Sequence, residues 1–299
     1  MAAPSLSLKA ALTQVGGDID RRLDSVLAIP DDPRADLYRA MRHAAIGGGK
    51  RLRPLLVFAT ARLFGVDRDC AGRAATAIEC IHVYSLIHDD LPAMDNDDMR
   101  RGKPTVHRAY DEATAILAGD SLHALAFEIL ADPATHPDAY VRAELVLELA
   151  RAAGPSGMSG GQAMDIEAEK SSFDLSTVTR LQALKTGALI ACAVEAGAIL
   201  GRVSPEGRTP LRGYARDVGL AFQIADDILD VEGDEAATGK KLRKDGEAGK
   251  ETFLSLLGLP RAREQARMLV AQAIDHLHGY GEEADLLRDI ARFTLERDR

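Results

Sequence analysis

The sequence IECIHVYSLIHDDLPAMDNDD, residues 78–98, joins an apolar segment to a dense run of carboxylates. The segment from Ile78 to His88 is largely apolar, which predicts a core helix. Pro92 falls inside the acidic run that follows. Because proline removes a backbone hydrogen bond and clashes with the preceding turn, we expect the helix to bulge or end there. Asp89 and Asp95, poorly aligned on an ideal helix, could then converge on one metal ion.

A second acidic cluster, Asp226-Asp227-Ile228-Leu229-Asp230, follows the apolar stretch from Val218 to Ala225. In a helix, Asp226 and Asp230 lie on one face, and Asp227 projects about 100° around the axis. Oxygen-only ligand sets suit Mg²⁺, which keeps several waters and completes its shell with substrate phosphates. One such run alone is more often a solvated face. Two related runs, each beside an apolar helix, favour a metal site.

The composition indicates an all-α protein. Aromatic residues make up 4% of the 299 residues, tryptophan is absent, and long segments rich in Ala, Leu, Ile, Glu and Arg show little β-branched alternation. No stretch has the character of an interdomain linker, so we expect one large helical bundle over residues 1–299, with sites formed by inward-facing side chains. Helices are predicted at 6–27, 34–46, 52–64, 74–88, 110–131, 137–152, 161–168, 174–201, 207–231 and from 261 to the C-terminus.

Charge and cysteine content indicate the compartment and exclude some partners. A net charge of −9 without a long basic tract argues against nucleic-acid binding. The three cysteines, Cys70, Cys80 and Cys192, are odd in number and lack metal-ligand spacing, so we expect core residues in a reducing cytoplasm. Residues 1–17 carry no signal pattern, and the apolar stretch 181–200 contains Lys185 and Glu195, which predicts a buried helix and no membrane insertion.

Basic motifs accompany both acidic clusters. Gly48 to Pro54 (GGKRLRP) joins flexible glycines to three cations, Met99 to Pro104 (MRRGKP) follows the first cluster, and Gly239 to Asp245 (GKKLRKD) follows the second. Glycines let backbone approach an anion closely, and arginine supplies a fork of donors. Alone, each motif is a solvated turn or an ion pair. Together with Mg²⁺ they would neutralise a polyanion, and without a P-loop sequence a diphosphate is favoured over a nucleotide.

These motifs, in this order, resemble the trans-prenyltransferases, the short-chain polyprenyl diphosphate synthases, and within them the bacterial farnesyl diphosphate synthases. The resemblance covers nearly the whole chain. It implies the isoprenoid synthase type of bundle with a central cavity, a homodimer, and condensation of isopentenyl diphosphate with dimethylallyl and then geranyl diphosphate. The segments that carry it are Gly48 to Pro54, Glu79 to Gly102, Gly119-Asp120, Gly160-Gly161-Gln162 with Asp165, Lys185-Thr186-Gly187, Phe222-Gln223, Asp226 to Asp230, Gly239-Lys240 and Lys250.

The resemblance also implies roles for individual residues. Three Mg²⁺ ions would be held by Asp89, Asp90, Asp95, Asp226, Asp227 and Asp230. The allylic diphosphate would bind Arg100, Lys185, Lys240 and Lys250. Isopentenyl diphosphate would bind Gly49, Lys50, Arg53, His82 and Arg101. Thr186 and Gln223 would offer oxygen dipoles to the carbocation. Gln162 and Asp165 could equally pack helices or support other residues. The charged segment from Lys241 to Ala248 and the C-terminal residues from Arg292 to Arg299 have open roles.

Tyr84 is the candidate residue for setting the length of the product. Tyr84 lies five residues before Asp89, roughly 7 to 8 Å deeper along a helix, where its ring could form the floor of the chain pocket beside the small Ser85. A tyrosine that only packs in the core is the commoner case. A geranylgeranyl or longer-chain synthase is the main alternative. A terpene cyclase has no second diphosphate to bind, and a non-catalytic partner chain would lack the Asp motifs.

Overall fold

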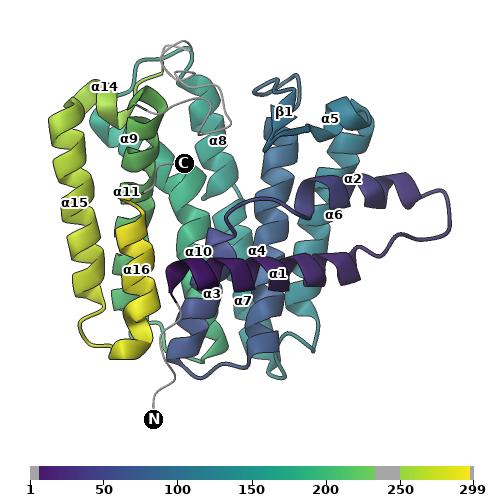
Figure 1. Ribbon diagram of the computed structural model, residues 1–299, viewed down its shortest axis with the longest axis horizontal. Coiled ribbons are helices and arrows are strands. Elements are labelled where there is room, and N and C mark those ends of the chain that lie inside the picture. The colour runs from purple at the N-terminus through teal and green to yellow at the C-terminus, as the bar shows by residue number, and fades with distance from the viewer. Residues whose placement is uncertain (1–6, 233–249, 297–299) are drawn as a thin grey trace.

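The computed structural model describes residues 7–232 and 250–296, which form a bundle of α-helices (Figure 1), so the all-α prediction is confirmed. Only two short strands accompany the helices in these ranges. The helices are α1 (Leu8–Val26), α2 (Ala35–Ala45), α3 (Leu52–Leu63), α4 (Arg68–Asp89), α5 (Val106–Ala109), α6 (Glu112–Ala131), α7 (Ala139–Ala153), α8 (Met158–Glu167), α9 (Leu175–Gln182), α10 (Ala188–Leu200), α11 (Thr209–Glu232), α14 (Phe253–Leu257), α15 (Leu259–His276) and α16 (Asp285–Phe293).

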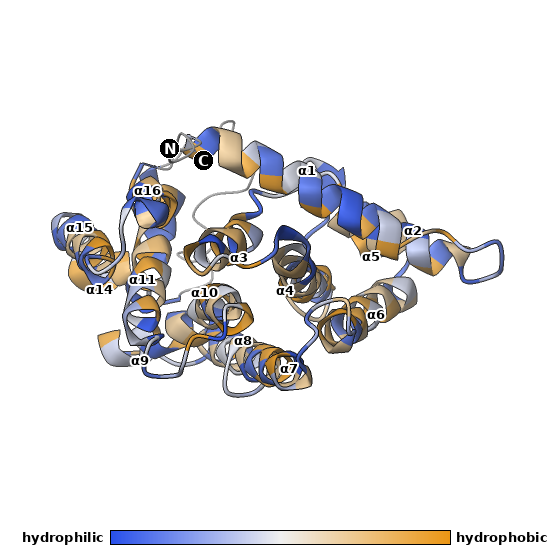
Figure 2. Cartoon of the chain, turned by 90° about the horizontal axis from the view of Figure 1, so that it is seen from below, coloured by the Kyte–Doolittle hydropathy of each residue, from blue (hydrophilic) through white to orange (hydrophobic). Residues whose placement is uncertain are grey.

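The core lies where α3, α4 and α10 meet. These helices are apolar around most of their circumference, and Figure 2 shows them inside the bundle with α1, α6, α7 and α11 around them. A Cβ atom on Gly197 would come within 2.6 Å of the Ala61 nitrogen. This glycine therefore lets α10 approach α3 backbone to backbone.

Helix α4 ends at Asp89, just before Pro92, as predicted. The chain then folds back on the helix end. The Asp95 amide donates to the Asp89 carbonyl over 2.8 Å, and the Asp97 amide donates to the Asp90 carbonyl over 3.2 Å. A two-stranded hairpin follows, β1 (Met99–Arg100) and β2 (Lys103–Pro104). Its turn has positive φ at Arg101 and Gly102, 52° and 75°. No pattern in the sequence predicts this hairpin, because strands of two residues are too short to show a period.

Several predicted boundaries are wrong. The helix expected from Arg261 to the C-terminus is interrupted, because Gly279 and Gly281 separate α15 from α16 and a short 3₁₀ turn, η2 (Glu282–Ala284), lies before α16. The helix expected over 174–201 contains a π-helical turn, η1 (Ala183–Gly187), between α9 and α10. Helix α4 begins six residues before the predicted Ala74, because the Asp67 side chain caps it. Cys80 and Cys192 are buried as expected, whereas Cys70 is partly exposed.

Two helical stretches, Glu112–Ala131 and Leu175–Leu200, are long and apolar enough by composition to cross a membrane. The second lies largely inside the bundle, as a core helix does. The first, α6, is less than half buried and exposes Ile116 and Leu117, at 45% and 55%. An apolar helix left this open on a globular protein is typical of an interface.

Candidate active site

The first Asp cluster is organised by the hairpin that follows it. Arg100 donates from Nε and Nη2 to the Asp90 carboxylate over 2.8 and 2.6 Å, and Asp90 is only 3% exposed. This charge-assisted pair ties the hairpin to the end of α4. Arg100, expected to bind an allylic diphosphate, therefore also has a carboxylate partner within the protein.

Asp89 lies among charges of both signs. Burial, with the neighbouring Asp95 and Asp90 carboxylates, raises the pKa of Asp89 to about 6, against the opposing effect of Lys185 and Arg100. Carboxylates that crowd each other in this way are stabilised by a nearby cation. Lys185, about a hundred residues later in the sequence, thus lies close enough to the end of α4 to favour the ionised form of Asp89.

Lys185 lies in the π-helical turn η1, a distortion that is frequent at functional sites. Helix α8 packs against this turn so closely that a Cβ on Gly161 would come within 2.2 Å of the Lys185 nitrogen. One oxygen of Asp165, on the same helix, accepts from Lys185 Nζ over 2.8 Å and from Lys250 Nζ over 2.9 Å. The Gly-Gly-Gln motif thus allows the helix contact, and Asp165 holds both lysines in place.

The second Asp cluster divides into two kinds of residue. Asp227 is buried, and its Oδ2 accepts the backbone amide of Phe253 over 2.8 Å, which ties α14 to α11. Asp226 and Asp230 are partly exposed on the same helix. Gln223 Nε2, one turn earlier, donates to Gln182 Oε1 over 2.5 Å. Gln182 was not predicted as a site residue, since no motif marks it.

The glycine-rich loop before α3 carries the hairpin's second arginine. Gly49 has a φ of +84°, and a Cβ there would come within 2.7 Å of the Arg101 guanidinium, so this position requires glycine. No described residue forms a hydrogen bond or ion pair with the side chain of Arg101 or Arg53, and the buried Nε of Arg53 has no partner. Burial lowers the pKa of both guanidiniums, opposed by Glu79. Two cations without a hydrogen-bonded carboxylate partner among the described residues suit an anionic ligand.

His82 lies among these arginines. Burial, with the charges of Arg53 and Arg101, holds its pKa well below the usual range, so the imidazole is neutral at pH 7. The Asp226 carboxylate, in the second Asp cluster, also attracts Arg53. Of the remaining predicted residues, Lys50 precedes α3, Thr186 follows Lys185 in η1, and Lys240 lies outside the described residues, together with Lys241 to Ala248.

The donor set fits Mg²⁺ held jointly with a ligand. Among residues 7–232 and 250–296, no group of three His, Cys, Asp or Glu side chains is close enough to hold a metal by itself. Magnesium ordinarily takes one or two carboxylates and completes its shell with phosphate oxygens and water. Asp90 and Asp227 already accept hydrogen bonds, but each carboxylate has further lone pairs.

Tyr84 belongs to an aromatic layer. Its half-buried ring makes edge-to-face contacts with His123 and His88, with centroids 5.1 and 5.7 Å apart, and Phe127 contacts His123 at 5.2 Å. Tyr84 on α4 thus packs against aromatic side chains of α6, and its role as the floor of a chain pocket stays a prediction. Ser85 Oγ donates to the His82 carbonyl over 2.9 Å. No sequence pattern links His123 to Tyr84, because His123 lies on another helix.

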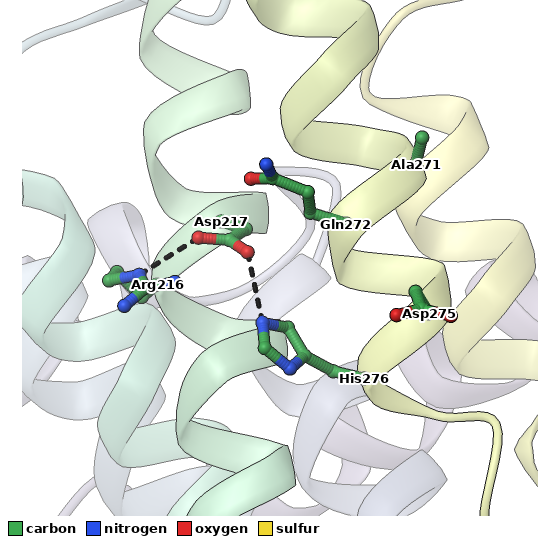
Figure 3. Close-up of a pocket in the computed structure, with 6 residues that line it drawn as sticks. All are labelled: Arg216, Asp217, Ala271, Gln272, Asp275 and His276. Atoms are coloured by element: carbon green, nitrogen blue, oxygen red, sulfur yellow. Dashed lines mark hydrogen bonds and ion pairs between the residues drawn. The ribbon is translucent and has the colours of Figure 1, made fainter.

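A surface cavity of about 450 Å³ between α11 and α15 contains none of the predicted residues (Figure 3). There the buried Asp217 accepts from Arg216 Nε over 2.8 Å and is 3.1 Å from His276 Nε2. Asp217 lies nine residues before Asp226, about 13 Å along the helix. Its carboxylate is fully partnered, and we assign it to the packing of the two helices.

Known proteins share this chain's sequence and fold. The polyprenyl synthetase family matches residues 34–288. Farnesyl diphosphate synthase of Escherichia coli (strain K12) is 47% identical over 269 residues, which cover 88% of this chain and 90% of the relative. Geranylgeranyl pyrophosphate synthase 3 of Arabidopsis thaliana is 44% identical over 85% of this chain and 72% of the relative.

A solved structure agrees with these sequence matches. An FPP/GFPP synthase from Zymomonas mobilis superposes with a TM-score of 0.89 at 59% identity, over 96% of this chain and 98% of that chain. Matches of this extent and identity show common ancestry as well as a shared fold. The chain therefore belongs to the polyprenyl synthetase family.

Proposed function

We propose that this prenyltransferase is a farnesyl diphosphate synthase, which condenses isopentenyl diphosphate head to tail with dimethylallyl and then geranyl diphosphate. The observation that carries the proposal is the separation of two anion sites. Arg53 and Arg101 lack carboxylate partners among the described residues, whereas Lys185 and Lys250 share Asp165 beside the Asp clusters. One site suits a diphosphate bound by cations alone, and the other a diphosphate bound together with Mg²⁺.

The allylic diphosphate would lie between the Asp clusters. Arg100, Lys185, Lys240 and Lys250 would bind its oxygens. Three Mg²⁺ ions, when bound, would neutralise the leaving group. The residues proposed to hold these ions are Asp89, Asp90 and Asp95 on one side and Asp226, Asp227 and Asp230 on the other.

Isopentenyl diphosphate would bind Lys50, Arg53 and Arg101, with the Gly49 backbone beside it. A neutral His82 supplies a ring N–H without adding charge. The substrate's double bond would attack the allylic carbocation that forms as the allylic C–O bond breaks. Thr186 and Gln223 would direct oxygen dipoles at this cation. The condensed cation then loses a proton to the released diphosphate, which restores the double bond.

The aromatic layer of Tyr84, His88, His123 and Phe127 supports a farnesyl product. Rings that contact each other across two helices form a firmer floor than one side chain would. The second candidate is a synthase of longer chains, favoured by the relatives named as geranylgeranyl and FPP/GFPP synthases. The arginine site disfavours a terpene cyclase.

We further propose a cytoplasmic homodimer that buries α6. This helix exposes Ile116 and Leu117, and α7 beside it exposes Leu147 and Tyr140. Exposed apolar side chains on two neighbouring helices are typical of a protein–protein interface. Light scattering of the purified chain should give twice the 32.1 kDa monomer mass.

The purified protein, incubated with isopentenyl and dimethylallyl diphosphates and Mg²⁺, tests the proposed activity. Chromatography after phosphatase treatment should yield farnesol. Geranylgeraniol as the main alcohol would favour the second candidate. A cyclic hydrocarbon, or no consumption of isopentenyl diphosphate, would contradict both.

A further inference from the structure

Arg51 is the residue immediately before α3, and its side chain points into the protein. Its φ of 52° places it in the left-handed region, and its side chain is 2% exposed. The guanidinium donates to Glu79 Oε1 over 2.5 Å, to Asp20 Oδ1 over 2.6 Å and to the Ala45 carbonyl over 2.6 Å. These acceptors belong to α4, α1 and the last residue of α2.

This one guanidinium connects both ends of the glycine-rich loop. The loop leaves α2 at Ala45, which accepts from Arg51, and enters α3 directly after Arg51. A left-handed backbone is unfavourable for a non-glycine residue and persists only where its surroundings enforce it. The guanidinium of Arg51 is a rigid fork of donors, and its hydrogen bonds to acceptors on three helices hold the backbone in this conformation. The position of the whole loop therefore depends on Arg51.

The loop and its flanks carry the cations of the isopentenyl diphosphate site. Gly49, two residues before Arg51, leaves room for the Arg101 guanidinium, and Arg53 follows two residues after Arg51. Glu79 attracts Arg53 and Arg101 but forms hydrogen bonds only with Arg51 among the described residues. Its carboxylate thus offsets the cluster's positive charge and leaves the other two guanidiniums with free donors.

We propose that Arg51, held by Glu79 and Asp20, is a positioning residue that sets the affinity for isopentenyl diphosphate without touching it. This inference rests on the proposed function. A purely structural ion pair would lower stability and affect both substrates alike. A positioning residue of this loop should affect the isopentenyl site selectively, because Lys185 and Lys250 are held by a different carboxylate, Asp165.

Arg51→Lys tests the role, because it keeps the charge but cannot reach three acceptors with a fork. Titration calorimetry with the full chain, Mg²⁺ and isopentenyl diphosphate, without allylic substrate, should show binding weakened about tenfold, a misplacement effect. The KM for geranyl diphosphate should stay within about twofold. The control is Arg22→Lys, since Arg22 also joins α1 to α4, through Asp69 at 2.6 Å, but lies away from the loop. Arg22→Lys should leave the dissociation constant for isopentenyl diphosphate and the KM for geranyl diphosphate unchanged.

Asp20→Asn provides a milder variant if Arg51→Lys does not fold. Asp20 is 33% exposed, and this substitution weakens only one of the three contacts of Arg51. Its expected effect is about threefold on the same dissociation constant. Wild-type affinity in the folded variants, or equal losses for both substrates, would overturn the positioning role. Failure of the wild-type chain to bind isopentenyl diphosphate would instead overturn the proposed function.

Discussion

Arg51, which is buried, and Arg53, which is partly buried, should have opposite effects on stability when each is replaced by methionine. Methionine keeps most of the aliphatic volume and removes the charge. Arg51 has two carboxylate partners, whereas Arg53 has none at hydrogen-bond distance among the described residues. In the absence of substrate, Arg51→Met should destabilise the protein and Arg53→Met should stabilise it.

The contacts of each guanidinium set the magnitude. Removing one partner of a buried ion pair costs about 3–5 kcal/mol, because the other charge stays buried. Glu79 is as deeply buried as Arg51, but Asp20 is partly exposed, so we expect a loss of about 3 kcal/mol for Arg51→Met. Burial and repulsion by Arg101 lower the pKa of Arg53 despite Glu79 and Asp226. Replacing such a charge by an apolar side chain should raise the free energy of unfolding by about 1 kcal/mol.

Urea denaturation followed by circular dichroism measures both values, and steady-state kinetics measures the functional consequence. Arg53→Met should reduce kcat/KM for isopentenyl diphosphate by about tenfold to a hundredfold, since charge-assisted hydrogen bonds contribute about 1.5–3 kcal/mol. A more stable enzyme with weaker substrate binding would identify Arg53 as a residue kept for its ligand. If Arg53→Met lowers stability as much as Arg51→Met, the interpretation of Arg53 as an uncompensated cation is refuted.

Four other expected outcomes follow from the site. Asp165→Asn weakens the ion pairs with Lys185 and Lys250 and should raise the KM for geranyl diphosphate about tenfold in steady-state assays. An unchanged KM would show that Asp165 does not position these lysines. Asp89→Asn, like removal of Mg²⁺ by EDTA, should reduce turnover at least about a hundredfold with the circular dichroism spectrum unchanged; near-normal turnover would argue against a metal role. Tyr84→Ala should extend the product from farnesyl to geranylgeranyl, seen by chromatography, and a farnesyl product would place the floor elsewhere. Burial and nearby arginines lower the pKa of His82 in the folded protein, so below about pH 6.5 the unfolded chain binds a proton that the folded protein does not. The free energy of unfolding should therefore fall as the pH is lowered from about 7 to 5. In a series of denaturation experiments, His82→Gln should reduce this pH dependence, and an unchanged dependence would contradict the assignment.

Local sequence patterns predicted much of this protein's helical architecture. The apolar run before Asp89 and the proline after it predicted where α4 ends, because helical periodicity and proline geometry act over a few residues. The same reasoning failed for the helix expected from Arg261 to the C-terminus, where Gly279 and Gly281 needed more weight. It also gave no sign of the hairpin after Asp98, whose short strands lack a period to detect.

The partners of the charged residues could be found only in the tertiary structure. In the motif Gly48 to Pro54, Arg51 and Arg53 are equivalent by composition and spacing, and both could have been ligands. The left-handed backbone at Arg51 turns its side chain toward Glu79, 28 residues away, while Arg53 has no ion-pair partner within the described part of the chain. A sequence determines which groups carry charge, because ionisation is a property of the side chain. Which charges are neutralised, and which remain to bind a substrate, depends on distances between separate helices, and these exist only after the bundle has folded.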